Sequence, residues 1–281
     1  MKTLQGRNAI VTGASRGLGV HIARTLARKQ VNLALAARSV DELDKVQREM
    51  ASLGVEAVAI PTDLTDTDQI AALAEKAEHR LGPVDLLVNN AGVELLSPYR
   101  DYPLEMLETI VQVNLLAPML LTRELLPGML DRGRGHILNM ASLAGKIGLP
   151  HQTPYAATKA SVIMFTHSLR AELLDEPVGA SVICPGFVDD SGMYARLDQG
   201  EHVKSGAPLA LKPTTAAKVS AAVIKAIERD TPEVVVNALP MRPVTVLREF
   251  FPRLTARMHQ LLGVTEYTRR LSAQLAQERK P

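Results

Sequence analysis

The chain has 281 residues, of which 46% are hydrophobic and 22% are charged, and its formal net charge is +2. This composition excludes a disordered chain, and the near balance of charge shows no sign of the basic surface that nucleic acid requires. The only cysteine, Cys184, excludes an intrachain disulfide, and the ligand spacings of a zinc site are missing, so no metal is expected. No apolar run is long enough for a signal peptide or a membrane span, and we expect a cytoplasmic protein.

Short apolar runs alternate with longer amphipathic stretches along most of the chain. The runs predicted as strands are residues 8–13, 31–37, 55–60, 84–90, 136–141, 180–185 and 233–237. Most are apolar throughout, as is typical of parallel strands covered on both faces. Helices are predicted between them, among them 17–29, 40–53 and 66–82, with Ser39 or Asp41 as the cap of the second. Repeated strand–helix–strand units predict an α/β fold with a Rossmann-like, doubly wound parallel sheet in a single domain.

A glycine-rich turn, "TGASRGLG", joins the first predicted strand to the first helix. Glycine permits a tight turn there and lets backbone N–H groups approach a pyrophosphate at the helix N-terminus. The spacing G-x-x-x-G-x-G differs from the standard dinucleotide fingerprint, but its place between strand and helix predicts a dinucleotide site. The residues of this turn predicted to bind the cofactor are Gly13, Ser15, Arg16, Gly17, Leu18 and Gly19.

The end of the second predicted strand indicates which coenzyme is used. An NAD-specific fold has an acid at this place, where it binds the adenosine ribose. Here Ala37 occupies that place and Arg38 follows it, while Arg16 in the glycine turn can approach the same ribose. Two guanidinium groups favour a 2′-phosphate, so we expect NADP(H). The alternative is that both arginines are solvated surface charges.

Tyr155 and Lys159 are four residues apart in "YAATK", so on a helix both side chains lie on one face. A nearby ammonium group lowers the pKa of a phenol, and we expect Lys159 to do this for Tyr155. Tyr155 would then serve as a general acid or base at a carbonyl or an alcohol. The alternative for such a pair is an exposed helix face.

The order and spacing of several motifs resemble the classical short-chain dehydrogenase/reductase family over residues 6–237. They are the glycine turn, "NNAG" at 89–92, Asn114, Ser142, Tyr155 with Lys159, and "PG" at 185–186. The resemblance implies an NADP(H)-dependent oxidoreductase that interconverts a carbonyl and a secondary alcohol of a small molecule. It also implies a homo-oligomer, either a dimer or a tetramer. The alternative function is a non-catalytic NADP(H)-binding sensor or scaffold on the same fold.

The same resemblance assigns roles to individual residues. Asn114, Ser142, Tyr155 and Lys159 would form the catalytic tetrad, in which Ser142 binds the substrate oxygen and Lys159 also holds the nicotinamide ribose. Further cofactor contacts would come from Asp63, Leu64, Asn90, Ala91, Gly92, Pro185, Gly186 and Val188. After the "PG" motif the family usually has a threonine, but this chain has Asp189 and Asp190, which leaves the contact to the carboxamide with Val188.

Three positions keep two interpretations each. Pro118 follows Asn114 by four residues and has no N–H, so it either frees the Asn114 carbonyl for a water of a proton relay or kinks a helix for packing. Asp63 either contacts adenine, as the resemblance implies, or caps a helix beside Asp66. His151 either lines a substrate pocket or is an incidental loop residue.

The substrate itself is indicated only by its surroundings. Residues 93–101 and 187–212 are expected to shape the pocket, and their mixed apolar character favours a hydrophobic ketone or alcohol.

The last part of the chain changes character. We expect a catalytic, dinucleotide-binding unit over residues 1–238 and a helical extension over 239–281, either part of the same domain or a lid or interface element. In "PRLTARMHQLLG" the residues Leu254, Met258, Leu261 and Leu262 share one helical face, with Arg253 and Arg257 on the polar side. We expect this face to pack on the domain, over the substrate cleft or against a subunit partner. A shallow membrane contact is the alternative.

Overall fold

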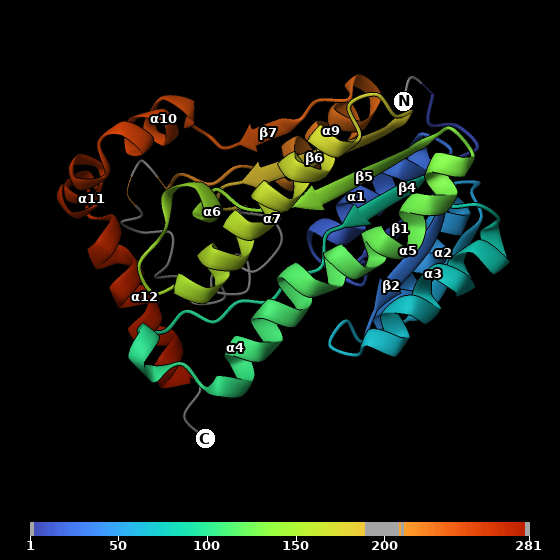
Figure 1. The fold of residues 1–281 in the computed structure, drawn as a ribbon. Coiled ribbons are helices and arrows are strands. Elements are labelled where there is room, and N and C mark those ends of the chain that lie inside the picture. The colour runs from blue at the N-terminus through green and yellow to red at the C-terminus, as the bar shows by residue number, and fades with distance from the viewer. Residues whose placement is uncertain (1–2, 189–207, 209–210, 279–281) are drawn as a thin grey trace.

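Seven parallel strands form one sheet in the order β3-β2-β1-β4-β5-β6-β7 in the computed structural model, which describes residues 3–188, 208 and 211–278 (Figure 1). The strands are β1 Asn8–Thr12, β2 Asn32–Ala37, β3 Ala57–Pro61, β4 Leu86–Asn89, β5 Gly135–Met140, β6 Val178–Pro185 and β7 Glu233–Val236. Each predicted strand is present, with its ends shifted by a few residues. The predicted α/β fold with a doubly wound parallel sheet is therefore confirmed.

Helices cover both faces of the sheet. They are α1 Leu18–Arg28, α2 Val40–Ser52, α3 Thr67–Leu81, α4 Leu104–Val111, α5 Ala117–Asp131, α6 Ala144–Ile147, α7 Thr153–Glu172, α9 Ala216–Arg229, α10 Arg242–Phe250, α11 Pro252–Leu261 and α12 Val264–Glu278, with the short turns η1 Tyr99–Asp101 and η2 Gln112–Leu116. Side chains alternate across each strand, so Ala9 and Val11 pack with α1, α2 and α9, while Ile10 packs with α3, α5 and α7. The core is thus two apolar layers with the sheet between them.

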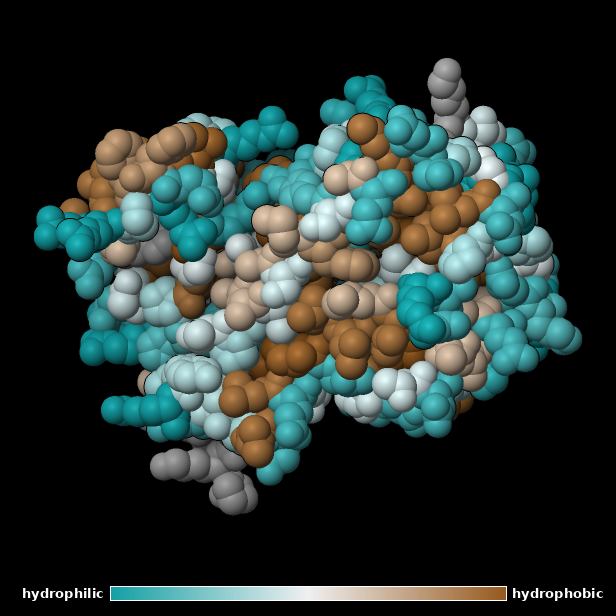
Figure 2. All heavy atoms as spheres, viewed as in Figure 1, coloured by the Kyte–Doolittle hydropathy of each residue, from teal (hydrophilic) through white to brown (hydrophobic). Residues whose placement is uncertain are grey.

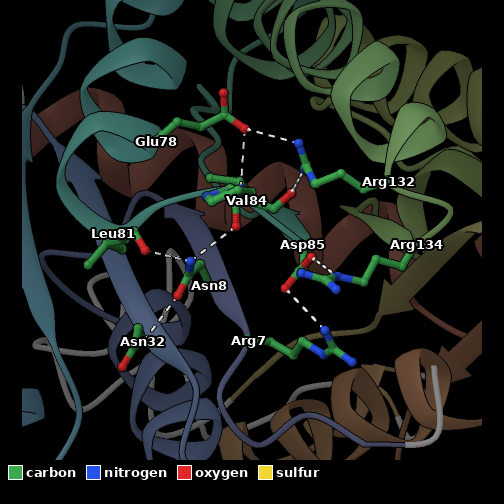
Figure 3. A network of polar contacts seen from close by, with 10 residues as sticks. Arg7, Asn8, Asn32, Glu78, Leu81, Val84, Asp85, Arg132 and Arg134 are labelled. Atoms are coloured by element: carbon green, nitrogen blue, oxygen red, sulfur yellow. Dashed lines mark hydrogen bonds and ion pairs between the residues drawn. The ribbon is translucent and has the colours of Figure 1, made fainter.

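The strand order reverses direction between β1 and β4, because the chain builds outward from β1 to β3 and then returns to β4 on the other side. In open α/β sheets a ligand binds at this switch point, outside the carboxyl ends of the strands. The opposite, amino edge of the sheet holds a network of paired polar side chains around Asp85 and Asn8 (Figure 3).

One long helix runs through α4, η2 and α5, from Leu104 to Asp131. Among the described residues it is the one helix long and apolar enough to cross a membrane by length and composition, so the expectation that no segment reaches that length is wrong. Packing in the core accounts for its apolar composition, because the helix contacts α3, β4 and β5 and buries Leu121, Leu125 and Met129. We therefore treat it as a core helix of the sheet.

The helix caps differ in one place from the prediction. Ser39 occupies the N-cap of α2, but its side chain makes no capping hydrogen bond, and Asp41 lies in the first turn of the helix. The side chain of Asp66 caps α3 by accepting hydrogen bonds from the backbone N–H groups of Asp68 and Gln69. An aspartate at this position satisfies two of the free N–H groups that begin every helix.

Three helices form the C-terminal extension. α12 packs through Leu271 and Leu275 against Leu96, in the segment that follows β4. The predicted apolar face of α11 does not pack on the domain, because Leu254, Leu261 and Leu262 are exposed. Packing of this face on the domain is therefore wrong, because the buried side of α11 is the one that carries Thr255. Contact of the face with a subunit partner stays a prediction.

Candidate active site

A cleft of about 500 Å³ lies at the carboxyl edge of the sheet and extends from the glycine turn to α7. Nearly all residues predicted from the sequence line this one cleft. They are Gly13, Ser15, Arg16, Gly17, Leu18, Gly19, Arg38, Asp63, Leu64, Asn90, Ala91, Gly92, Ser142, Tyr155, Lys159, Pro185, Gly186 and Val188. Asn114 is buried beside the cleft and is not part of its lining.

The glycine turn leaves the N-terminus of α1 open. Gly17 is the N-cap residue at φ 58°, no side chain caps the helix, and its first turn carries no acid. A Cβ on Gly13 would lie 2.9 Å from the Cα of Ala91, and one on Gly19 would lie 2.1 Å from the carbonyl oxygen of Gly13. Glycine is thus required at both places for the turn to close. The free N–H groups and the helix dipole suit a pyrophosphate, so this turn fits a dinucleotide.

Asn90 ties the end of β4 to the glycine turn. Its side-chain Nδ2 donates to the carbonyl oxygens of Thr12 and Gly13, at 2.9 and 3.4 Å. The hydroxyl of Thr12 accepts hydrogen bonds from the backbone N–H groups of Asn90 and Ala91, both at 3.0 Å. These contacts hold the two loops at the switch point in one arrangement.

The adenosine end of the cleft carries the two predicted arginines. Arg16 and Arg38 are exposed and line the cleft beside Ala37. Neither forms an ion pair with any carboxylate in the described part of the chain. Glu42, in the first turn of α2, lines the same end and was missed by the sequence analysis. Both guanidinium groups therefore remain available to an anionic group there.

Asp63 lines the cleft after β3 and does not cap a helix. Its Oδ1 accepts hydrogen bonds from the backbone N–H and the hydroxyl of Thr65, both at 2.9 Å. Because Asp66 provides the cap of α3, the helix-cap interpretation of Asp63 is wrong. Its contact with adenine stays a prediction.

Tyr155 and Lys159 lie one turn apart on α7 and are almost fully buried. The ammonium group of Lys159 donates to the carbonyl oxygen of Met140 at 2.8 Å and lies 5.8 Å from the centre of the Tyr155 ring. The hydroxyl of Tyr155 is hydrogen-bonded to Ser142, which begins the loop after β5. The exposed-face alternative for the pair is therefore wrong.

Burial changes both pKa values at this centre. The pKa of Tyr155 is raised, chiefly by desolvation and further by the charge of Glu94, while the Ser142 hydrogen bond acts against this rise. Burial lowers the pKa of Lys159 to about 8. The predicted lowering of the tyrosine pKa by Lys159 is thus wrong in direction, because desolvation of the phenolate outweighs the ammonium charge. At neutral pH Tyr155 holds its proton and is ready to donate it.

Asn114 sits in a π-helical turn, η2, between α4 and α5. Its side chain accepts from the N–H of Val93 at 2.8 Å and donates to the carbonyl oxygen of Val93 at 2.9 Å, which fixes the segment after Gly92. A Cβ on Gly92 would lie 3.4 Å from Asn114 Oδ1 and 3.5 Å from Lys159 Nζ, so Asn114 stands beside the lysine. Such π-turns are frequent at functional sites. Neither interpretation of Pro118 is decided by these contacts.

Comparison with known proteins decides the family. The sequence profile of the short chain dehydrogenase family matches residues 7–202. A curated relative, the ketoacyl reductase HetN of Nostoc sp., is 39% identical over 275 residues, which are 96% of this chain and 94% of the relative. The chain belongs to the short-chain dehydrogenase family. It is therefore an oxidoreductase, and the cleft described above is its candidate active site.

Solved structures of the family share the architecture. A metagenomic short-chain oxidoreductase in complex with NADP superposes with a TM-score of 0.71 and 32% identity, covering 84% of this chain and 99% of that one. A short-chain dehydrogenase from Burkholderia phymatum in complex with NAD superposes with a TM-score of 0.79 and 26% identity, covering 90% and 96%. Both of these neighbours therefore hold a nicotinamide dinucleotide.

The substrate end of the cleft in this dehydrogenase is mainly apolar. Its lining here comes from the loop after β5, from α6 and from the segments after β4 and β6, namely Val93, Leu143, Ile147, Leu149, Phe187 and Leu211. The predicted pocket segments 93–101 and 187–212 thus contribute Val93, Glu94, Phe187, Val188 and Leu211 to the cleft. Asp189 and Asp190 lie outside the described residues. His151 is not part of the lining of this cleft, so its interpretation as a pocket residue is wrong.

A polar pair stands in this apolar end, formed by Glu94 of the predicted pocket segment 93–101 and by Gln152, which the sequence analysis missed. The amide Nε2 of Gln152 donates to Glu94 Oε2 at 2.9 Å, and both residues line the cleft. Gln152 is buried, and its Oε1 has no hydrogen-bond partner among the described residues. The place of Gln152 just before the α7 tyrosine is a signal that could have identified it, whereas nothing in the sequence predicts its pairing with Glu94.

Proposed function

We propose that this protein is an NADP(H)-dependent reductase that converts the carbonyl of a hydrophobic, ketoacyl-type substrate into a secondary alcohol. The observation that carries the proposal is the single cleft, in which the open helix N-terminus and two arginines lie at one end and Ser142, Tyr155 and Lys159 at the other. The name of the Nostoc relative, a ketoacyl reductase, supports the substrate class. The apolar lining at the catalytic end supports the same class.

The roles of the residues follow from their contacts. When bound, the nicotinamide supplies the hydride that the carbonyl carbon accepts. Ser142 and Tyr155 share a hydrogen bond and can both reach a substrate oxygen. Tyr155, which is protonated at neutral pH, gives that oxygen its proton. Lys159, anchored by Met140, keeps a positive charge beside the phenol as it loses its proton. Reduction is the direction that a protonated tyrosine favours.

The experiment that tests this function is a turnover assay on the purified chain. A ketoacyl thioester, a hydrophobic aryl ketone and a short polar ketone are offered with NADPH, and the nicotinamide absorbance is followed. We expect substrate-dependent oxidation of NADPH that is fastest with the ketoacyl or aryl compound. Tight binding of NADPH without oxidation by any carbonyl would instead support the sensor or scaffold alternative.

A further inference from the structure

Large apolar side chains are exposed together on α10, on α11 and at the junction between them. They are Val246, Phe250, Phe251, Leu254, Leu261 and Leu262. Phe250 is 74% exposed and Leu261 is 86% exposed, and the chain has only four phenylalanines, of which two stand here. Figure 2 shows brown and tan atoms gathered at the upper left, where Figure 1 places α10, with teal atoms around them. A soluble surface rarely gathers apolar side chains in this way without a function.

The same segment is basic. Between Pro240 and Gly263 the sequence has four arginines and one glutamate, Glu249. Arg242, Arg253 and Arg257 are exposed and have no ion-pair partner within the described part of the chain. Arg257 follows Leu254 by three residues and precedes Leu261 by four, so on the helix the arginine borders the two leucines. We call these exposed apolar and arginine side chains of α10 and α11 the basic apolar face.

We propose that the basic apolar face binds the surface of an anionic lipid bilayer. Phenylalanine and leucine on one side of a short helix, bordered by arginine, are the composition of helices that lie in the headgroup region. Each arginine near such a surface is attracted by its negative potential. The apolar side chains enter the acyl boundary, while the guanidinium groups remain among the phosphates.

A second copy of the chain fits this face less well. In a two-fold dimer the same patch meets itself, so the arginines of one copy would approach those of the other. Only Glu249 on this segment could neutralise them. A bilayer of anionic lipid supplies the missing negative charge on its whole surface.

The face also lies close to the catalytic cleft. Arg248 of α10 donates to the carbonyl oxygen of Lys146 in α6, and Met241 and Val264, which flank α10 and α11, pack in the apolar cluster with Tyr155. The segment that carries the face therefore packs behind residues that line the substrate end of the cleft, such as Leu143 and Ile147. Binding to a bilayer would bring the substrate end of the cleft near the lipid. The assignment of that end to a substrate rests on the proposed function, whereas the binding to lipid does not.

The test measures binding of the full chain to sedimenting vesicles of phosphatidylcholine, with or without phosphatidylglycerol. We expect co-sedimentation with the anionic vesicles and about tenfold less with phosphatidylcholine alone, since the arginines need negative lipid. The double variant Arg253→Glu with Arg257→Glu should lose about tenfold or more in binding. The matched control, Arg100→Glu with Arg123→Glu, makes the same charge change at exposed positions outside the face and should bind as the unmodified chain does.

Insertion is tested separately by fluorescence, because the chain has no tryptophan. In Phe250→Trp the emission should shift to shorter wavelength with anionic vesicles, whereas Leu174→Trp, at a position 80% exposed outside the face, should not shift. The proposal would be overturned if the chain co-sedimented with neither kind of vesicle. It would also be overturned if the chain bound no vesicles and its sedimentation coefficient showed a dimer that Phe250→Ser converts into a monomer. Neither readout depends on a substrate, so failure here is distinct from failure of the proposed reaction.

Discussion

The two edges of the parallel sheet use polar residues in opposite ways. At the amino edge, the buried carboxylate of Asp85 lies 2.8 Å from Arg134 and 3.7 Å from Arg7, and Asn8 donates to the carbonyl oxygens of Leu81 and Pro83 (Figure 3). These groups are paired with one another, although Arg7 Nε has no hydrogen-bond partner among the described residues. At the carboxyl edge, Arg16 and Arg38 face the cleft without an ion-pair partner among the described residues.

This difference follows from what each edge must do. Charged groups that form ion pairs with each other hold strand ends together, but they leave no charge or hydrogen-bonding group to bind a ligand. An edge that binds and reacts must leave donors, charges and a proton for a molecule from outside, and this costs some stability. We therefore expect changes at the carboxyl edge to alter activity with little effect on stability, and changes at the amino edge to do the reverse.

The largest expected effect is on turnover in Tyr155→Phe. The variant lacks only the hydroxyl that donates the proton, so turnover should fall by about two orders of magnitude or more. Folding and NADPH binding should be retained, as measured by thermal unfolding and by nicotinamide fluorescence. Tyr99→Phe is the matched control, since Tyr99 is exposed outside the cleft. Near-normal turnover in the first variant would contradict the assignment of Tyr155 as the proton donor.

A somewhat smaller effect is expected on coenzyme choice. The unmodified protein should bind NADPH at least about tenfold more tightly than NADH, since a charged hydrogen bond to the 2′-phosphate contributes roughly 1.5–3 kcal/mol. Arg38→Asp should erase or reverse this preference, as measured by titration with both coenzymes. Arg48→Asp is the control, because Arg48 is an exposed arginine on α2 outside the cleft lining. Equal affinities in the unmodified protein would contradict recognition of the 2′-phosphate by Arg16 and Arg38.

The strands, and the gathering of the predicted residues in one cleft at the carboxyl edge, could be predicted well because both depend on local patterns. Unbroken apolar runs identify buried parallel strands, and a parallel sheet brings all its carboxyl ends to one edge. The need for glycine at Gly13 and Gly19 also follows from the turn itself, since a side chain at either position would collide with the backbone.

The errors have a common physical origin in long-range packing. The pKa of Tyr155 depends on how deeply α7 is buried and on Glu94, which lies far away in the chain. The pairing of Glu94 with Gln152 joins segments that only the fold brings together. The helical pattern of α11 identified its apolar face, but a pattern cannot say whether a face turns inward or outward.

At the amino edge, Asp85→Asn should lower the free energy of unfolding by about 2 kcal/mol, because it leaves Arg7 and Arg134 without their buried partner. Turnover of the folded variant should stay near that of the unmodified enzyme. Denaturant unfolding and the turnover assay, made on the same preparation, check both statements. Asp101→Asn serves as the control, since Asp101 is exposed. A large loss of turnover with unchanged stability would contradict the division between the two edges.

The smallest expected effect is a pH dependence of stability that also belongs to the amino edge. His136, at the start of β5, is buried, is hydrogen-bonded to Ser181 at 2.9 Å, and has its pKa lowered to about 4, chiefly by burial. In the unfolded chain the imidazole takes up a proton near pH 6.5, whereas in the folded chain it does so only near pH 4. The stability of the folded state is therefore highest above pH 6.5 and decreases as the pH falls toward 4.

Between pH 7 and pH 5 this one group should remove about 2 kcal/mol of stability or slightly less, and His136→Gln should abolish this loss. Denaturant unfolding at the two pH values measures the change, with exposed His79→Gln as the control. Turnover at pH 7 should be the same in both variants, because the histidine lies at the edge opposite the cleft. An unchanged pH dependence in His136→Gln would place the acid sensitivity elsewhere in the fold.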